Sequence, residues 1–249
     1  MTEIKADWVI LNVADGTTMR GYVARPHDTA PHTGLLVFQE AFGVNGHIRD
    51  VTERFAREGY IAVAPELFHR TAPGFEGAYT NFEAVMPHIR ALTDQNLAAD
   101  VRSAFEWLGA DLGTQGQPIA CVGFCMGGRM TFLTNALLPV KAAISFYGGG
   151  IAPNPFSSGL LSRAGDLHAP QLLFWGGLDK HIGPEQTRMV TESLRAAGKP
   201  FVNVEFSDAD HGFFCDARSS YNPSAARQAW GLALTFLNIY ASRQDTDCQ

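Results

Sequence analysis

The chain has 249 residues, of which 46% are hydrophobic and 18% are charged. A chain of this length and composition can bury roughly three quarters of its unfolded surface, so we expect one globular domain spanning residues 1–249. The formal net charge of -6 offers no basic field to attract a polyanion. Nucleic acid is therefore excluded as an expected partner.

The lack of a targeting signal and the pattern of cysteines predict a cytoplasmic protein. The first ten residues, MTEIKADWVI, lack a basic segment followed by an apolar run. No window approaches the ~18 uninterrupted apolar residues of a membrane span, so we expect no membrane partner. The cysteines are Cys121, Cys125, Cys215 and Cys248. They do not suggest a disulfide framework, and none of them forms the Cys-x-x-Cys pair that is typical of zinc or redox sites.

The chain opens with a predicted antiparallel pair of strands. Residues Trp8 to Asn12 and Met19 to Ala24 flank Asp15-Gly16, a dipeptide that supplies the positive φ angles of a tight hairpin. Beyond it, short apolar runs alternate with segments of helical period. These runs are Leu35 to Gln39, Ile61 to Ala64, Ile119 to Gly123, Ala142 to Tyr147, Gln171 to Trp175 and Val202 to Phe206. The alternation predicts an α/β fold, a mostly parallel sheet with helices on both faces.

Three helices are predicted from spacing and from turn residues. One carries the apolar stripe from Leu97 to Leu108, one runs from Met126 to Leu138, and the last begins near Pro223. The segment from Phe68 to about Pro87 is rich in glycine, proline and aromatic residues. It is either a cap over a site or an ordinary surface connection.

The most informative motif is Gly-x-Cys-x-Gly, from Gly123 to Gly127, between a predicted strand and a predicted helix. A nucleophile on such a sharp turn has a strained backbone, and its neighbours two residues away must be small. The N-terminus of the following helix favours a thiolate at Cys125. A lone buried cysteine is otherwise most often a small hydrophobe, as we expect for Cys121.

Two further residues follow later strands in the order that a catalytic triad requires. Asp179 follows the strand that ends at Trp175, and His211 follows the strand that ends at Phe206. Functional residues of doubly wound sheets gather at the carboxyl ends of strands, which favours a nucleophile, acid and histidine arrangement with Cys125.

Other residues compete for these two roles. A loop aspartate such as Asp179 commonly caps a helix or closes a turn. Asp210 adjoins His211, but adjacent residues rarely face one another. His181 is only two positions from Asp179, a spacing that does not bring it over a turn on another strand.

The motifs together resemble those of the dienelactone hydrolase (carboxymethylenebutenolidase) family. They are Phe38 to Asn45 (FQEAFGVN), Ala64 to Phe68 (APELF), Gly123 to Gly128 (GFCMGG), Gly176 to Asp179 (GGLD) and His211 to Phe213 (HGF). The resemblance covers nearly the whole chain. It implies the α/β-hydrolase fold, with about eight strands, and a Cys125, His211 and Asp179 triad. It also implies that Glu40 interacts with the Cys125 thiol in the resting enzyme until substrate displaces the glutamate. By sequence alone, Glu40 is equally well an acid paired with a cation.

The expected chemistry needs no metal or organic cofactor. The backbone N–H groups of Met126 and Ala41 are the expected oxyanion hole. A thiolate nucleophile suits a small-molecule ester or lactone better than an amide, and the protein is expected to be a monomer or a homodimer.

Substrate recognition departs from the family pattern. Characterised dienelactone hydrolases hold a substrate carboxylate with arginines, one of them four residues after the catalytic histidine. That position is Cys215 here, so Arg218 and Arg129 are the substrate-binding candidates, with Arg70 and Arg90 as further possibilities.

Two rival functions follow from the same residues. A non-catalytic protein could keep the pocket and use Cys125 as a peroxide sensor. The histidine and aspartate favour an enzyme, because a sensor has less need of a positioned proton shuttle. A serine hydrolase using Ser145 is excluded, since no serine lies in a Gly-x-Ser-x-Gly motif.

Overall fold

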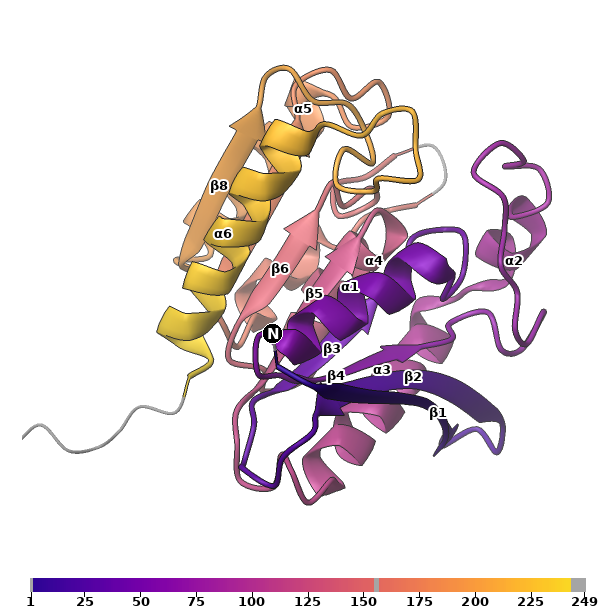
Figure 1. Ribbon diagram of the computed structural model, residues 1–249. Coiled ribbons are helices and arrows are strands. Elements are labelled where there is room, and N and C mark those ends of the chain that lie inside the picture. Colours follow the sequence, from indigo (N-terminus) through magenta and orange to yellow (C-terminus); the bar gives the residue numbers. More distant parts are fainter. Residues whose placement is uncertain (1, 155–156, 243–249) are drawn as a thin grey trace, which may run out of the picture.

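An eight-stranded sheet forms the middle layer of the computed structural model, which describes residues 2–154 and 157–242 (Figure 1). The spatial order of the strands is β1-β2-β4-β3-β5-β6-β7-β8. Strands β3 to β8 run parallel to one another, and the β1·β2 and β2·β4 pairs are antiparallel. The strands are β1 (Ile4–Asn12), β2 (Thr18–Pro26), β3 (Gly34–Phe38), β4 (Ile61–Pro65), β5 (Ile119–Phe124), β6 (Ala143–Phe146), β7 (Gln171–Gly176) and β8 (Phe201–Phe206).

The opening strand pair is as predicted, but its connection is looser than a tight hairpin. Residues 13–17 join β1 to β2, and of the expected dipeptide only Gly16 has a positive φ, 86°. Asp15 instead accepts hydrogen bonds from the backbone and hydroxyl groups of Thr17, at 3.0 and 2.6 Å. The aspartate therefore stabilises the loop through its side chain and does not need left-handed backbone geometry.

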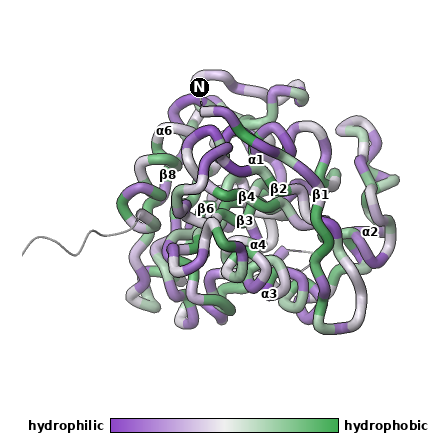
Figure 2. Tube along the Cα trace, turned by 60° about the horizontal axis from the view of Figure 1, so that its bottom comes forward, coloured by the Kyte–Doolittle hydropathy of each residue, from purple (hydrophilic) through white to green (hydrophobic). Residues whose placement is uncertain are grey.

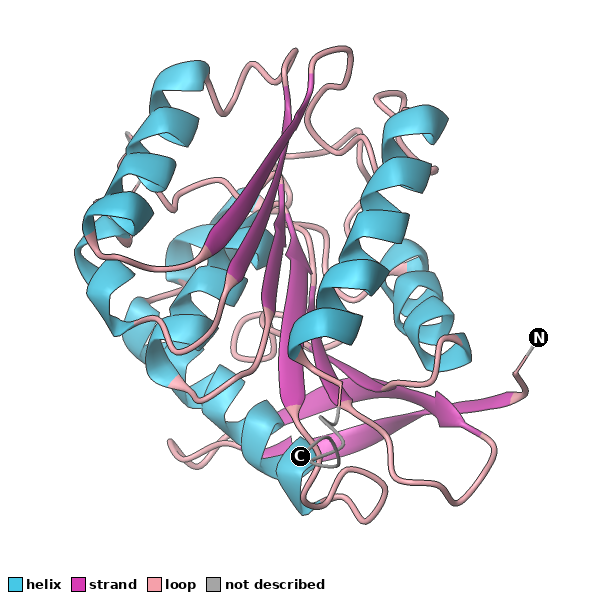
Figure 3. Ribbon diagram, turned by 90° about the vertical axis from the view of Figure 1, so that its left-hand side faces the viewer, coloured by secondary structure: helices cyan, strands magenta, loops and turns pink. Residues whose placement is uncertain are grey.

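Helices cover both faces of the sheet (Figure 3). On one face α1 and α6 meet through Phe55 and Trp230, whose ring centroids are 4.5 Å apart. On the other face α3 packs on α4, and the 3-10 helix η1 packs between α4 and α5. The bounds are α1 (Gly46–Arg57), α2 (Met86–Ala91), α3 (Asp94–Ala110), α4 (Met126–Leu137), η1 (Leu161–Asp166), α5 (Pro184–Ala196) and α6 (Pro223–Tyr240).

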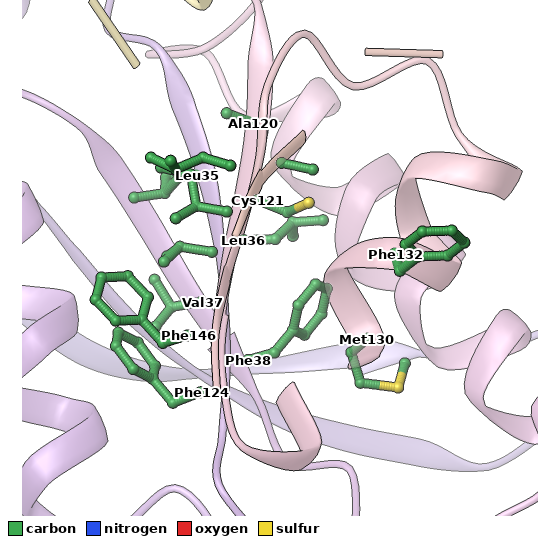
Figure 4. Close-up of a cluster of buried hydrophobic side chains, with 14 of the residues drawn as sticks. Leu35, Leu36, Val37, Phe38, Ala120, Cys121, Phe124, Met130, Phe132 and Phe146 are labelled. Carbon is green, nitrogen blue, oxygen red and sulfur yellow. The ribbon is translucent and has the colours of Figure 1, made fainter. Parts of the chain in front are cut away.

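The central strands are buried along their whole length because helices cover both of their faces. Hydrophobic segments accordingly concentrate along these strands in Figure 2. Figure 4 shows alternate side chains of β3 on opposite faces: Val37 lies on the side of Phe124, and Phe38 on the side of Met130. Within the described residues, no helix is long and apolar enough to cross a membrane.

The register aligns the carboxyl ends of the parallel strands at one edge. Phe38 of β3 pairs with Gly123 of β5, and Phe146 of β6 pairs with Phe174 of β7. The loops that follow these strands therefore meet at this edge, where open parallel sheets bind ligands.

Candidate active site

Cys125 occupies the sharp turn between β5 and α4. Its backbone angles are φ 54 and ψ -116, a strained conformation for a residue with a side chain. The Cys125 N–H donates to the Phe146 carbonyl at 3.0 Å, and the Gly128 N–H donates to the Cys125 carbonyl at 2.9 Å. These bonds hold the partly exposed thiol at the N-terminus of α4, where the helix favours a negative charge.

The glycines on either side of the turn are required by close backbone packing. A Cβ atom at Gly123 would overlap the Gly127 carbonyl, and one at Gly127 would overlap the carbonyls of Phe38 and Gln39. Backbone atoms cannot rotate away as a flexible side chain can. The Gly-x-Cys-x-Gly spacing is therefore a steric requirement of this turn.

His211 and Asp179 are hydrogen-bonded to each other. The Nδ1 atom of His211 lies 2.7 Å from Oδ2 of Asp179. The other carboxylate oxygen, Oδ1, accepts from the backbone N–H groups of His181 and Ile182 at 2.7 and 3.0 Å. Burial would raise the pKa of Asp179, but these hydrogen bonds and the charge of His211 hold it below its ordinary value. The carboxylate is thus fixed in one orientation and stays ionised.

His211 also interacts with Cys125. Burial alone would lower the pKa of His211, but the charge of the Cys125 thiolate and the hydrogen bonds with Asp179 and Cys125 raise it to about 10. A protonated imidazole opposite a thiolate is a pair that can exchange a proton. The structure thus brings the imidazole of His211 together with the Cys125 sulfur and the Asp179 carboxylate.

The competing residues take other positions. The ring of His181 packs edge-on against His211, with centroids 5.5 Å apart, so it lies nearer than its spacing from Asp179 suggests. Asp179, however, meets His181 through the backbone N–H. Asp210 accepts the backbone N–H of His211 at 2.6 Å and does not hydrogen-bond the ring.

The two residues expected to form the oxyanion hole have unpaired backbone N–H groups within the described residues. Met126 is the first residue of α4, and Ala41 lies in the turn after β3. Neither N–H donates to another group among the residues that the structure describes. Ala41 belongs to an apolar cluster with Phe42, Phe68 and Val85, and Met126 packs against that cluster.

The segment from Phe68 to Pro87 borders the site. Phe68 belongs to the apolar cluster that contains Ala41, and Phe75 and Tyr79 pack against that cluster. The Gly77 N–H donates to the Phe42 carbonyl at 3.0 Å. Of the two interpretations of this segment, the contacts favour a cap at the site over a remote connection.

Glu40 is completely buried and is paired with a cation. Its Oε1 accepts from Nη1 of Arg218 at 3.2 Å, and its Oε2 has no hydrogen-bond partner among the described residues. The Arg218 guanidinium also lies near the rings of Phe42 and Tyr79, with centroids at 5.8 and 5.6 Å. The carboxylate of Glu40 is hydrogen-bonded to Arg218 and not to Cys125 in this state.

Two of the other candidate arginines, Arg129 and Arg70, are bound elsewhere. Arg129 donates to Asp94 at 2.7 Å and to the Gly150 carbonyl at 3.2 Å. Arg70 is paired with Asp15 and Asp100. Among these three arginines, Arg218 is the one that the structure brings to Glu40.

Several buried groups at the site did not emerge from the sequence. Tyr147 directly follows β6, has a φ of 38°, and buries a hydroxyl with no partner among the described residues. Its ring centroid is 5.1 Å from that of His211. The Cys215 sulfur donates to the Tyr79 hydroxyl, and burial together with the Glu40 charge raises the pKa of Cys215 to about 11. Position after a strand was a usable signal for Tyr147, whereas nothing local marks Cys215.

The chain was compared with known proteins. Residues 19–241 match the model of the dienelactone hydrolase family. A candidate carboxymethylenebutenolidase of Synechocystis sp. is 39% identical over 219 residues, which cover 84% of this chain and 87% of the relative. One from Escherichia coli is 34% identical over 239 residues, covering 93% and 86%.

Solved structures agree with the sequence matches. The crystal structure of a candidate dienelactone hydrolase from Klebsiella pneumoniae superposes with a TM-score of 0.86 at 32% identity, covering 96% of this chain and 100% of that chain. The acylaminoacyl peptidase of Pyrococcus horikoshii, 16% identical, shares the fold alone, with a TM-score of 0.74 over 100% of this chain and 43% of its own. The chain therefore has the predicted α/β-hydrolase fold and belongs to the dienelactone hydrolase family.

Proposed function

We propose that this chain hydrolyses a small ester or lactone through a thiolate at Cys125, with His211 as proton shuttle and Asp179 as the group that orients it. The observation that carries the proposal is the 2.7 Å hydrogen bond that Nδ1 of His211 donates to Oδ2 of Asp179, together with the interaction of the same ring with the Cys125 sulfur. Family membership supports the same reaction class. This combination is what nucleophilic acyl transfer requires.

In the first half-reaction the thiolate forms a bond to the carbonyl carbon, and the carbonyl oxygen becomes an oxyanion. The N–H groups of Met126 and Ala41 donate to this oxygen. When the tetrahedral intermediate collapses, the carbon–oxygen bond of the ester breaks and the His211 imidazolium protonates the leaving alkoxide. The products are a thioester at Cys125 and an alcohol, which remains attached to the acyl group when the substrate is a lactone.

In the second half-reaction His211 takes a proton from water, and the resulting hydroxide attacks the thioester. The intermediate expels the thiolate, which restores the starting state and releases the acid. Throughout the cycle Asp179 keeps the proton of His211 on Nδ1 and leaves Nε2 free to exchange protons. Every proton therefore passes through one nitrogen atom.

Arg218 is positioned to bind a negatively charged substrate. The Arg218 side chain is 21% exposed while it is bound to Glu40. A substrate carboxylate could replace Glu40 as its partner, because a guanidinium binds any carboxylate with the same paired geometry. We therefore favour an anionic lactone over a neutral one.

The test is a panel of lactones and activated esters, each with and without a free carboxylate, given to the wild type, to Cys125→Ala and to Arg218→Gln. We expect many equivalents of product per chain from the wild type and none above background from folded Cys125→Ala. Arg218→Gln should raise KM for the anionic substrates more than for the neutral ones. A single modification at Cys125 without turnover would favour the peroxide sensor instead.

A further inference from the structure

Three buried side chains converge behind the catalytic groups. A carboxylate oxygen of Glu40, a ring nitrogen of His47 and the sulfur of Cys215 all lie within 4.8 Å of one another. They come from the turn after β3, the first turn of α1 and the turn after His211. Their exposed fractions are 0%, 7% and 0%. No role in the proposed hydrolysis uses His47 or Cys215.

Two polar atoms of this cluster lack partners. Oε2 of Glu40 and Nε2 of His47 are both buried, and neither has a hydrogen-bond partner within the described residues. Leaving a buried donor or acceptor unsatisfied is costly and is rare in native structures. Both atoms belong to residues of the cluster that includes the Cys215 thiol, so a ligand bound within the cluster would satisfy them together.

The imidazole of His47 is held as a metal ligand would be. Its ring packs edge-on against the stacked rings of Phe124 and Phe214, with centroids at 6.1 and 6.3 Å. Its Nδ1 atom lies 3.8 Å from Oδ1 of Asp216, so Nε2 points away from that carboxylate. A carboxylate behind a histidine ring is the usual arrangement that orients a metal-bound imidazole.

We propose that Glu40, His47 and Cys215 form a binding site for a thiophilic divalent cation such as Zn²⁺. Carboxylate oxygen, imidazole nitrogen and thiolate sulfur are the ligands that Zn²⁺ prefers. Its bond lengths of about 2.0–2.3 Å place tetrahedral ligands about 3.3–3.6 Å apart, a contraction that side-chain rotation supplies. Water completes the fourth position. No sequence motif marks this site, because Cys215 is far along the chain from Glu40 and His47.

Charge balance permits the cation beside Arg218. The guanidinium occupies Oε1 of Glu40 and leaves Oε2 for the metal. Binding releases the Cys215 proton to solvent, so the carboxylate and the thiolate offset two of the three positive charges of the ion and Arg218. Asp216, 3.8 Å from His47, supplies a third negative charge beside the site. The cation would hold Glu40 in its buried position. Provided that the proposed function is right and substrate must displace Glu40, the cation inhibits hydrolysis.

Binding can be tested without measuring activity. Cd²⁺ is the probe, because it takes the same ligands as Zn²⁺ and forms an ultraviolet charge-transfer band with a thiolate. The protein used is the Cys125→Ala variant, which lacks the reactive thiol. It retains the buried Cys121, which shows whether a core thiol alone gives the band. We expect about one equivalent of Cd²⁺ per chain with a thiolate band. Adding Cys215→Ser should abolish the band.

Two further variants separate binding from misfolding. His47→Gln should weaken Cd²⁺ binding by more than about 100-fold, and Asp216→Asn, at an exposed residue, by about 10-fold. His47→Gln keeps every thiol of the background, so it decides the matter if Cys215→Ser does not fold. No band in the Cys125→Ala protein, or a band that survives both substitutions in folded protein, would overturn the site.

The inhibitory part is measured separately on protein that retains Cys125. Zn²⁺ should inhibit ester hydrolysis reversibly, a chelator should restore it, and Cys215→Ser should need a higher Zn²⁺ concentration for the same fractional loss. A Cys215-dependent Cd²⁺ band with no Zn²⁺ inhibition would refute inhibition and keep the site. Absence of any hydrolysis would instead refute the proposed function, and the Cd²⁺ result would stand by itself.

Discussion

Replacing Asp179 with asparagine should impair proton exchange at His211 without removing any contact. Oδ1 of Asp179 accepts two backbone N–H groups, from His181 and Ile182, at 2.7 and 3.0 Å. In Asp179→Asn the amide oxygen must keep this position, because the amide nitrogen cannot accept a hydrogen bond. The NH₂ group is then forced toward Nδ1 of His211, where the carboxylate Oδ2 lies at 2.7 Å.

The size of the effect follows from the tautomer. Facing an NH₂ donor, Nδ1 of His211 must be an acceptor, so the remaining proton moves to Nε2. That nitrogen can no longer take a proton from Cys125 or from water. The same change of tautomer in a serine triad lowers kcat by about 10⁴-fold. Because a thiol is more acidic than a hydroxyl, we expect a somewhat smaller loss here, about 10³-fold.

The assay is kcat for an activated ester, with the thermal midpoint measured on the same preparations. Asp210→Asn is the matched control, because it also removes a carboxylate next to His211, but one that accepts only the backbone N–H. We expect the control to retain activity within about 10-fold. A folded Asp179→Asn protein as active as Asp210→Asn would refute the assigned role of Asp179.

The remaining predictions concern the turn, the pH profile and Glu40. Gly127→Ala forces a Cβ onto two backbone carbonyls and should lower the free energy of unfolding by more than about 3 kcal/mol. In the control Gly231→Ala, the added Cβ has nothing within 4 Å and should stabilise α6 by about 0.5–1 kcal/mol. Equal thermal midpoints of the two variants would contradict the close packing. Because the pKa of His211 is raised to about 10, its imidazolium persists through neutral pH and is lost only as pH rises toward that value. The rate should therefore fall as pH approaches 10, because the imidazolium that protonates the leaving group is lost, and a rate that stays constant through this range would exclude the coupled pair. Glu40→Gln leaves its arginine partner without a counter-charge and should lower stability by about 1–3 kcal/mol. It should also speed iodoacetamide alkylation of Cys125 and lower turnover. Unchanged alkylation and turnover per folded molecule would make Glu40 purely structural.

The central strands and the pairing of Asp179 with His211 could be predicted, because they follow from local sequence patterns and from the parallel order of the strands. The strand from Ile119 is a continuous apolar run, and its end at Phe124 lies one residue from the predicted end. Gly123 and Gly127 report a steric constraint that acts within five positions of the chain. Asp179 and His211 were found because parallel strands bring their carboxyl ends together.

The rest could not be predicted because it depends on contacts between distant segments. Nothing near Glu40 identifies Arg218 as its partner, 178 positions away. Arg129 appeared as good a candidate by sequence, yet Asp94 binds it. The convergence of His47 and Cys215 likewise follows from packing of α1 against the turn after β8.

The central claim is that the acyl group of the substrate is transferred to Cys125. The most direct measurement is peptide mass spectrometry of wild-type protein quenched with acid during turnover of an activated ester. We predict that the acyl mass is found on the peptide that contains Cys125 and disappears when substrate is exhausted. Steady turnover with the acyl mass on another residue would contradict the account.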